Sequence, residues 1–464
     1  MKNTELIQLL RAFSQEEFKK FGEFLRSEYF NKLKNLVRLY EVLERYYPEF
    51  ETDRYNLFSE VFPGEKYDDA RLRVLMSRML AISKQFLAYE IYRYDEESFM
   101  INESRAMFNK GQLKAFNKSV SNAEKLIEGK ELRDERGIYK RYELTLLKNS
   151  VKGNYGLTED DLREEEELLI IHAVVSILRT YVTLLNRGTV LELKDKTDRV
   201  KLIEPLIEEY KSNHLVKVYY GFYQVLKEPE REDLFEVCLG LLDISDSYFG
   251  VEEIFDLYVI LLNYCVLRVG NPKYRQHKFT IYKTVLSKGY LPREGLNFPY
   301  VYFNNVVNSA IESGEYEWGW KFMEENKDKL EDDIRENLVY HCEAKLYYGE
   351  GEYDMALDSL SKMRNPDSVD VFFRLAIRDL QIKILYDMGH YENIYPAIDN
   401  YQHYLKKNKT LNEQVKSSYR TYLDNLKKLT DIESGAANKK NFEKEIATGE
   451  FVHKKWILEK AGEL

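Results

Sequence analysis

The chain has 464 residues and a formal net charge of −10, which argues against non-specific binding of nucleic acid or anionic lipid by the molecule as a whole. With only 9 Pro and 22 Gly and no long alternation of apolar and polar residues, a sheet is excluded and an all-α protein larger than one compact core is predicted. Three widely spaced cysteines, Cys238, Cys265 and Cys342, imply neither a disulfide framework nor a zinc site and fit a reducing compartment.

The sequence of residues 1–97 predicts an N-terminal helical cap domain. Ser14 and Glu17 have the spacing of a capping box, in which each side chain satisfies a free backbone N–H at the start of a helix. A second apolar segment spans 33–47, and Asp68 or the residue after it can begin a long helix with one apolar stripe. The stripe consists of Leu72, Leu75, Met76, Met79 and Leu80. Such a domain suits the end of a helical array, because the outermost helices of an array otherwise expose apolar surface.

Over residues 98–433, helical segments of roughly 12 to 20 residues alternate with short turns. This alternation predicts antiparallel helix pairs stacked into a solenoid. Thr158 and Asp161 mark the start of one helix, and the acidic run 164–167 lies near that start, where the helix dipole favours negative charge. We therefore predict a structural role for the acidic run.

The longest apolar run, 168–185, has about the length of a membrane span but contains His172 and Arg179. Because a central Arg makes insertion into a bilayer costly, we predict that the run is a helix buried within the array. The N-terminal residues carry charges within their apolar stretch and lack the cleavage pattern of a signal peptide. A cytoplasmic protein without membrane insertion is expected.

The repeat is clearest over residues 297–407, where one short pattern occurs three times. A glycine ends one helix, and a tyrosine two positions later begins the next. Glycine tolerates the left-handed backbone of a tight turn, and the tyrosine can pack back on the first helix. The glycines are Gly314, Gly351 and Gly389, and the tyrosines are Tyr316, Tyr353 and Tyr391.

This pattern resembles the tetratricopeptide repeat, a helix-turn-helix unit of about 34 residues, and the best match is 337–367. The residues that match the family's aromatic, small, turn and final proline positions are Tyr340, Ala344, Tyr347, Gly351, Tyr353, Ala356 and Pro366. The sequence departs from the family's pattern in two ways. The repeat is longer than in the family, and Gly319 or Ile394 stands where the second Ala of the pattern belongs. The resemblance implies a right-handed solenoid whose first helices line a concave groove for an extended peptide.

Residues 434–464 predict a short linker and a C-terminal amphipathic helix. The sequence KKWILEKAGEL near the end, together with FSQEEFKKFGEFLRSEYFN near the start, also resembles helical proteins of the Bacteroidota and related bacteria. That second resemblance implies no function.

Motifs for catalysis, cofactors and metals are absent from the sequence. It contains no Gly-rich phosphate loop, no H-E-x-x-H and no G-x-S-x-G. His341 and Cys342 are neighbours, but consecutive residues on a helix point about 100° apart, so they are not predicted to form a catalytic pair. We predict a protein that is not an enzyme and has no catalytic residues, no cofactor and no metal site.

A repeated polar spacing on the first helices of the repeats is the strongest candidate for a binding site. Three positions at i, i+4 and i+7 form one line along a helix, and the same spacing returns in the next repeat. We define the polar row as Asn304 and Asn308 in one repeat, His341, Lys345 and Tyr348 in the second, and Asp379, Lys383 and Tyr386 in the third. Asn can pair with a peptide backbone, Lys with a carboxylate, and Tyr can stack and donate a hydrogen bond.

Two interpretations of the polar row stay open from the sequence. In the first, which the tetratricopeptide resemblance implies, the row is partly exposed and binds an extended peptide. In the second it is a hydrophilic helix face, with Asn308 bonded to a neighbouring helix.

The function predicted first is a non-enzymatic interaction scaffold that binds a peptide or partner protein of unknown identity. The alternatives are a peptide-responsive regulator whose N-terminal domain is the output and an RNA-binding helical repeat, which the acidic balance disfavours. An enzyme with an unrecognised site comes last, and the sequence leaves the oligomeric state open.

Overall fold

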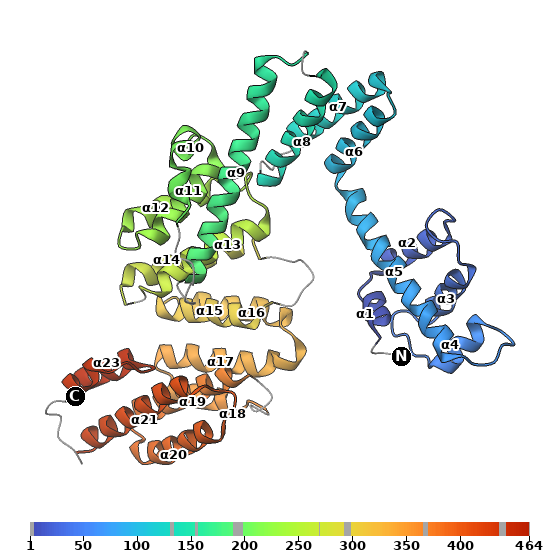
Figure 1. Ribbon diagram of the computed structural model, residues 1–464. Coiled ribbons are helices and arrows are strands. Elements are labelled where there is room, and N and C mark those ends of the chain that lie inside the picture. The colour runs from blue at the N-terminus through green and yellow to red at the C-terminus, as the bar shows by residue number, and fades with distance from the viewer. Residues whose placement is uncertain are drawn as a thin grey trace. The chain divides into compact units, whose positions relative to one another are not determined.

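The protein is all-α. The computed structural model describes residues 4–129, 134–153, 156–188, 198–268, 270–291, 298–364, 370–435 and 442–463. Helices account for 79% of these described residues, and no strand occurs among them, which confirms the predicted fold class (Figure 1). The chain divides into two compact units, one formed by Met1–Leu226 with Ser247–Phe249 and the other by Lys227–Asp246 with Gly250–Leu464. The predicted domain boundaries after residues 97 and 433 stay predictions.

Unit 1 contains eleven described α-helices and one short 3₁₀ helix. They are α1 (Glu5–Arg11), α2 (Gln15–Arg26), α3 (Lys34–Glu44), α4 (Arg54–Val61), α5 (Asp69–Tyr94), α6 (Glu96–Asn109), α7 (Leu113–Glu128), α8 (Glu135–Lys152), α9 (Glu159–Gly188), η1 (Val200–Leu202), α10 (Glu204–Glu209) and α11 (His214–Lys227).

The first five helices share one aromatic core. Helices α1 to α4 each contact α5, as Figure 1 shows, and their apolar faces meet around Phe18, Phe21 and Phe86. The predicted capping box of α2 is present, because Ser14 Oγ accepts from the Glu17 N–H and the Glu17 carboxylate accepts from the Ser14 N–H. Helix α5 starts where predicted, and all but one of the predicted stripe residues are buried in this core.

Helix α9 corrects the prediction of a fully buried apolar helix. It begins after Thr158, whose hydroxyl accepts a hydrogen bond from the Asp161 N–H at 3.2 Å, as predicted. Its most apolar window is only 33% buried, because one stripe faces α8 and α10 while residues such as Leu169 and Leu184 are exposed. By length and composition α9 could cross a bilayer, although a core helix of a soluble protein meets the same criterion.

Unit 2 contains the remaining described helices. They are α12 (Glu232–Asp243), α13 (Val251–Val266), α14 (Pro272–Ser287), α15 (Tyr300–Glu312), α16 (Tyr316–Asn326), η2 (Lys327–Lys329), α17 (Asp332–Glu350), α18 (Tyr353–Ser361), α19 (Val371–Asp387), α20 (Tyr391–Lys407), α21 (Glu413–Glu433), α22 (Phe442–Thr448) and α23 (Lys454–Glu463). Contacts run mainly between helices that are adjacent or next but one in sequence, which is the packing of a solenoid.

The glycine and tyrosine pattern sets the turns of three helix pairs. Gly314, Gly351 and Gly389 have φ values of 75°, 83° and 71°, the left-handed region that favours glycine. Each second helix of these pairs, α16, α18 and α20, begins at the predicted tyrosine. Both halves of the sequence prediction for these turns are therefore confirmed.

Small residues allow neighbouring helices of the repeats to approach one another closely. Ala344 of α17 and Ala356 of α18 are both fully buried and lie in one cluster with Leu380 and Ile384 of α19. These are two of the alanine positions matched to the tetratricopeptide pattern. Pro366, the predicted end of that repeat, lies outside the described residues.

The C-terminal region forms two short helices, α22 and α23, rather than the single helix predicted. Helix α23 contacts α21 and lies beside α17 and α19, as Figure 1 shows. Ile457 and Ala461 on its inner face are fully buried in the core shared with α19, α20 and α21. The end of the chain thus packs on the first helices of the repeats, where the polar row was predicted.

Candidate functional site

The polar row is assembled by three helices of unit 2. Helix α15 carries Asn304 and Asn308, α17 carries the second set and α19 the third. The Lys345 ammonium donates a hydrogen bond to Asn304 Oδ1 at 2.6 Å, so the rows of α15 and α17 face each other directly. The Tyr348 hydroxyl donates to the Asp387 carboxylate at the end of α19, which joins the second row to the third. Two predicted residues thus meet between α15 and α17, whereas between α17 and α19 the hydrogen bond of Tyr348 goes to Asp387, which was not predicted.

Exposure of the polar row differs from the prediction at three positions. Asn304, Asn308, Lys345, Tyr348 and Lys383 are partly buried, in agreement with the prediction of partial exposure. The prediction is wrong for three residues that are buried, with exposed fractions of 0% for His341, 5% for Asp379 and 6% for Tyr386.

The reason for this burial is different at each of the three positions. The His341 ring is covered from α19, where Phe373 packs edge to face with a centroid distance of 4.8 Å. Asp379 lies beneath Tyr401, whose hydroxyl donates to Asp379 Oδ1 at 2.9 Å. Tyr386 is covered by Trp456 of α23, with ring centroids 5.3 Å apart.

His453, immediately before α23, reaches into the third repeat. Its Nε2 lies 2.9 Å from Asp379 Oδ2, and the Lys383 ammonium lies 3.1 Å from its Nδ1. The Nδ1 atom can accept a hydrogen bond from Lys383, whereas Nε2 faces the carboxylate without the geometry of a hydrogen bond. His453 therefore lies between Asp379 and Lys383, two residues of opposite charge in the polar row.

Trp456 and Lys460 continue these contacts along α23. The Trp456 indole N–H donates to the Tyr348 hydroxyl at 3.3 Å, and the Lys383 ammonium lies 5.6 Å from the centre of its ring. Lys460 Nζ lies 3.0 Å from Asp387 Oδ1, at a carboxylate that is only 6% exposed. A helical segment of the chain itself thus occupies the surface predicted to hold a peptide.

Charge in the polar row is costly to bury. Burial, together with the nearby charge of Lys383, lowers the pKa of Lys345 to about 8. Among the described residues no carboxylate pairs with Lys345, and its one hydrogen bond goes to a neutral amide. Burial also lowers the pKa of Lys383, although the carboxylates of Asp379 and Asp387 oppose that shift. The lysine charges of the polar row therefore contribute little to the stability of the fold.

Asn308 differs from Asn304 in having no partner within the described chain. It is partly buried, one helical turn beyond Asn304 on the same face of α15, and its side chain makes no hydrogen bond to another described residue. The interhelical bond that the second interpretation assigned to Asn308 is not formed with any described residue.

Sequence reasoning missed the residues that cover the polar row. These are Asp387, Tyr401, His453, Trp456 and Lys460. One signal was present: His453, Trp456, Ile457 and Lys460 have the i, i+3, i+4, i+7 spacing of one helix face, which is typical of a helix that docks on another surface.

Nothing in the geometry assembles a catalytic or metal centre from the described residues. No group of three or more His, Cys, Asp and Glu side chains among them is placed to hold a metal ion. The three cysteines are free and buried, and burial raises the pKa of Cys342 to about 11 and lowers that of His341 well below its usual value. A thiol and an imidazole held neutral in this way are poorly suited to nucleophilic chemistry.

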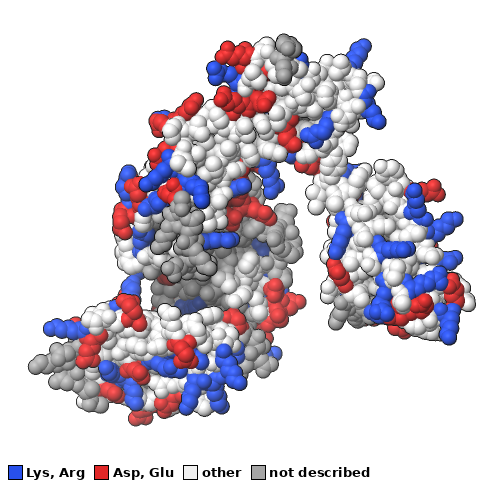
Figure 2. Space-filling view, in the orientation of Figure 1, with Lys and Arg blue, Asp and Glu red and all other residues white. Residues whose placement is uncertain are grey.

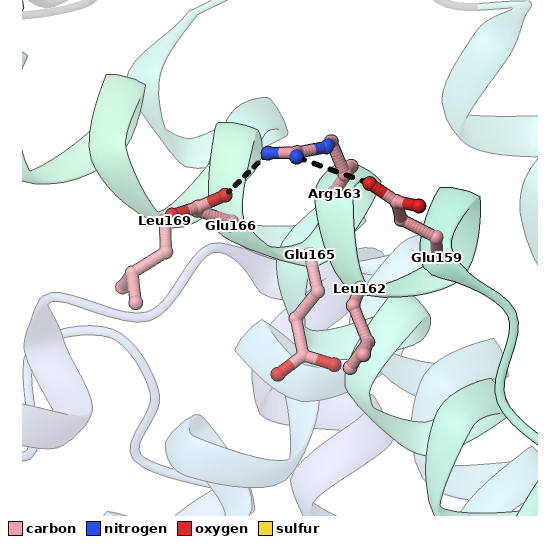
Figure 3. Close-up of a pocket in the computed structure, with 6 residues that line it drawn as sticks. All are labelled: Glu159, Leu162, Arg163, Glu165, Glu166 and Leu169. Carbon is pink, nitrogen blue, oxygen red and sulfur yellow. Dashed lines mark hydrogen bonds and ion pairs between the residues drawn. The ribbon is translucent and has the colours of Figure 1, made fainter.

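A shallow depression on α9 contains part of the acidic run 164–167. Its lining comes entirely from the first turns of that helix: Glu159, Leu162, Arg163, Glu165, Glu166 and Leu169. As Figure 3 shows, Arg163 lies between two of these carboxylates, 3.1 Å from Glu159 and 3.7 Å from Glu166. Glu165 accepts a hydrogen bond from the Asn149 side chain of α8 at 2.7 Å. These carboxylates have partners within the chain, which agrees with a structural role.

Comparison with known proteins gave no match: no family model, no curated protein and no solved structure matches the chain.

Proposed function

We propose that the protein is a non-enzymatic interaction scaffold that binds a segment of a partner protein along the polar row of α15, α17 and α19. One observation carries this proposal. Polar side chains of successive helix pairs face one another along one surface, and that surface accepts a helix through His453, Trp456 and Lys460. A surface that accommodates such a segment in cis has the shape and the hydrogen-bonding groups to accommodate one in trans.

The finer assignment of these helix pairs as tetratricopeptide repeats belongs to the same proposal. The positive-φ glycines and the buried contact between Ala344 and Ala356 support it. In that family the first helices of the repeats line a concave groove, and under this proposal α15, α17 and α19 correspond to those first helices.

Charge favours a protein partner over RNA. Figure 2 shows Lys and Arg side chains interspersed with Asp and Glu over the drawn face of the described residues. On α17 and α19, within and beside the polar row, Asp379 and Asp387 balance Lys345 and Lys383, whereas a repeat that tracks a phosphate backbone needs an excess of cations.

Asn308→Ala tests the proposed function. A partner obtained by affinity purification with the full chain should bind this variant more weakly by about 0.5 to 1.5 kcal/mol, the usual value of one lost hydrogen bond. The free energy of unfolding should be nearly unchanged, because Asn308 has no partner in the described chain. Titration calorimetry with the purified partner and a thermal melt measure the two quantities.

Asn305→Ala is the matched control, since Asn305 is the same residue type on the same helix but is exposed on a different face. It should leave both affinity and stability unchanged. Equal affinities of the Asn305 and Asn308 variants would identify the polar row as a solvated face and reject the proposed function.

A further inference from the structure

The C-terminal segment, which we define as residues 450–463, contacts the repeats through polar as well as apolar side chains. Three of its side chains meet charged or hydroxyl groups: His453 meets Asp379 and Lys383, Trp456 meets Tyr348, and Lys460 meets Asp387. Ion pairs removed from water contribute little net stability compared with apolar contacts of similar size. The polar part of this contact consists of groups that water can also satisfy, which suits a segment that leaves and returns.

The outer face of α23 is compatible with release. Lys455 pairs only with Glu459 of the same helix, at 3.5 Å, and both side chains are more than half exposed. Six apolar residues of the segment pack in the core of unit 2: Phe451, Ile457 and Ala461 are buried, and Val452, Trp456 and Leu458 are partly buried. A displacing helix therefore has to cover this apolar stripe as well as the polar groups.

The backbone at His453 also indicates a conformation held by docking. His453 has a φ of 58°, in the left-handed region that costs a residue other than glycine about 1 kcal/mol. Nothing local requires this conformation. It directs the imidazole between Asp379 and Lys383, so the contacts with α19 compensate the backbone cost.

We propose that the C-terminal segment is an intramolecular ligand of the polar row, and that the partner displaces it with a helix of the same chemistry. Such a segment presents an imidazole on the residue just before the helix, an indole three residues later, and an ammonium four residues after the indole. Asp379, Tyr348 with Tyr386, and Asp387 are the complementary groups on the repeats. This inference rests on the proposed function and names the class of its partner.

A labelled synthetic peptide of residues 450–463 tests the inference on the full chain. In the Lys460→Glu chain the new carboxylate faces Asp387, so the tethered segment should leave the polar row and free it for the peptide. In the wild-type chain the tethered segment acts at an effective concentration on the order of millimolar and excludes the peptide. Fluorescence anisotropy should therefore give a peptide Kd at least about tenfold lower for the Lys460→Glu chain than for wild type.

The matched control is Lys455→Glu, the same substitution on the same helix at a side chain that is 58% exposed and points away from the repeats. This variant should bind the peptide as poorly as wild type. A peptide in which the residue equivalent to Trp456 is Ala should bind the Lys460→Glu chain at least about tenfold more weakly, because it lacks the indole contacts with Tyr348 and Tyr386.

Hydrogen exchange of residues 454–463 shows whether each variant has released the segment, and Trp456→Ala serves as a second releasing variant. Release without peptide binding would overturn the inference, and so would a segment that stays protected in both variants. The proposed function has a separate test, because a partner that still depends on Asn308 while the peptide fails to bind would reject only the intramolecular ligand.

Discussion

Asp379→Ala should lower the free energy of unfolding of unit 2 by about 3 to 5 kcal/mol, the largest effect of any single substitution in the polar row. The carboxylate is 5% exposed and serves two neighbours, the Tyr401 hydroxyl at 2.9 Å and His453 Nε2 at 2.9 Å. Its charge also offsets the burial of the Lys383 ammonium. The alanine variant removes the closer acceptor of the buried Tyr401 hydroxyl and a nearby opposite charge from the Lys383 ammonium, and burying such groups unpaired is the costly part.

Chemical denaturation of the full chain measures this effect. The chain has three tryptophans, Trp318, Trp320 and Trp456, and all of them lie in unit 2, so their fluorescence follows the unfolding of that unit. Asp358→Ala on α18 is the control. Its carboxylate is 54% exposed and pairs only with Lys362, so a loss below about 0.5 kcal/mol is expected. Similar losses in the two variants would contradict the buried network described for Asp379.

Lys345→Met should raise the free energy of unfolding of unit 2 at pH 7 by about 1 to 3 kcal/mol. The substitution removes a buried ammonium that no described carboxylate compensates and keeps most of the side-chain volume. Asn304 is only partly buried, so water can replace the lost donor. The same variant should bind the partner more weakly, because the ammonium is proposed to serve the ligand rather than the fold.

The pH dependence of this difference follows from the pKa of Lys345, which is about 8 in the folded chain and about 10.5 when the lysine is exposed in the unfolded chain. Between these two pH values the unfolded wild-type chain binds more protons than the folded chain. The free energy of unfolding of the wild type therefore increases with pH relative to that of Lys345→Met. The advantage of the methionine variant should therefore be complete below pH 8 and shrink towards pH 10.5. Lys321→Met, at a side chain that is 71% exposed, should show neither effect. An advantage that does not change with pH would show that it has another cause.

The features that the sequence predicted correctly depend on neighbours in the chain. The capping box of Ser14 and Glu17 spans one turn, and the turn at Gly351 with Tyr353 spans three residues. The i, i+4, i+7 spacing likewise placed the polar row on one face of each helix. Such patterns can be read from the sequence because the interactions that they specify are local.

The burial of Asp379 and Tyr386 could not be predicted in the same way. Asp379 is covered in part by His453 and Tyr386 by Trp456, residues about 70 positions away, and no periodicity specifies which helix face a distant segment will meet. The polar row looked like an exposed surface because polar residues usually are exposed. For α9, the apolar run indicated a buried helix, but composition does not say how many of its sides have neighbours.

The central claim is our proposal that the C-terminal segment, although it packs in the core of unit 2, is bound to the repeats as a ligand and opens separately from them. Native-state hydrogen exchange of the wild-type chain tests this claim most directly, because it measures the free energy of opening helix by helix. Amides of α23 should exchange through an opening at least about 2 kcal/mol less costly than the openings of α17 and α19, whose protection should persist while the segment is released. Equal opening free energies for α17, α19 and α23 would show that they unfold as one unit and would contradict the claim.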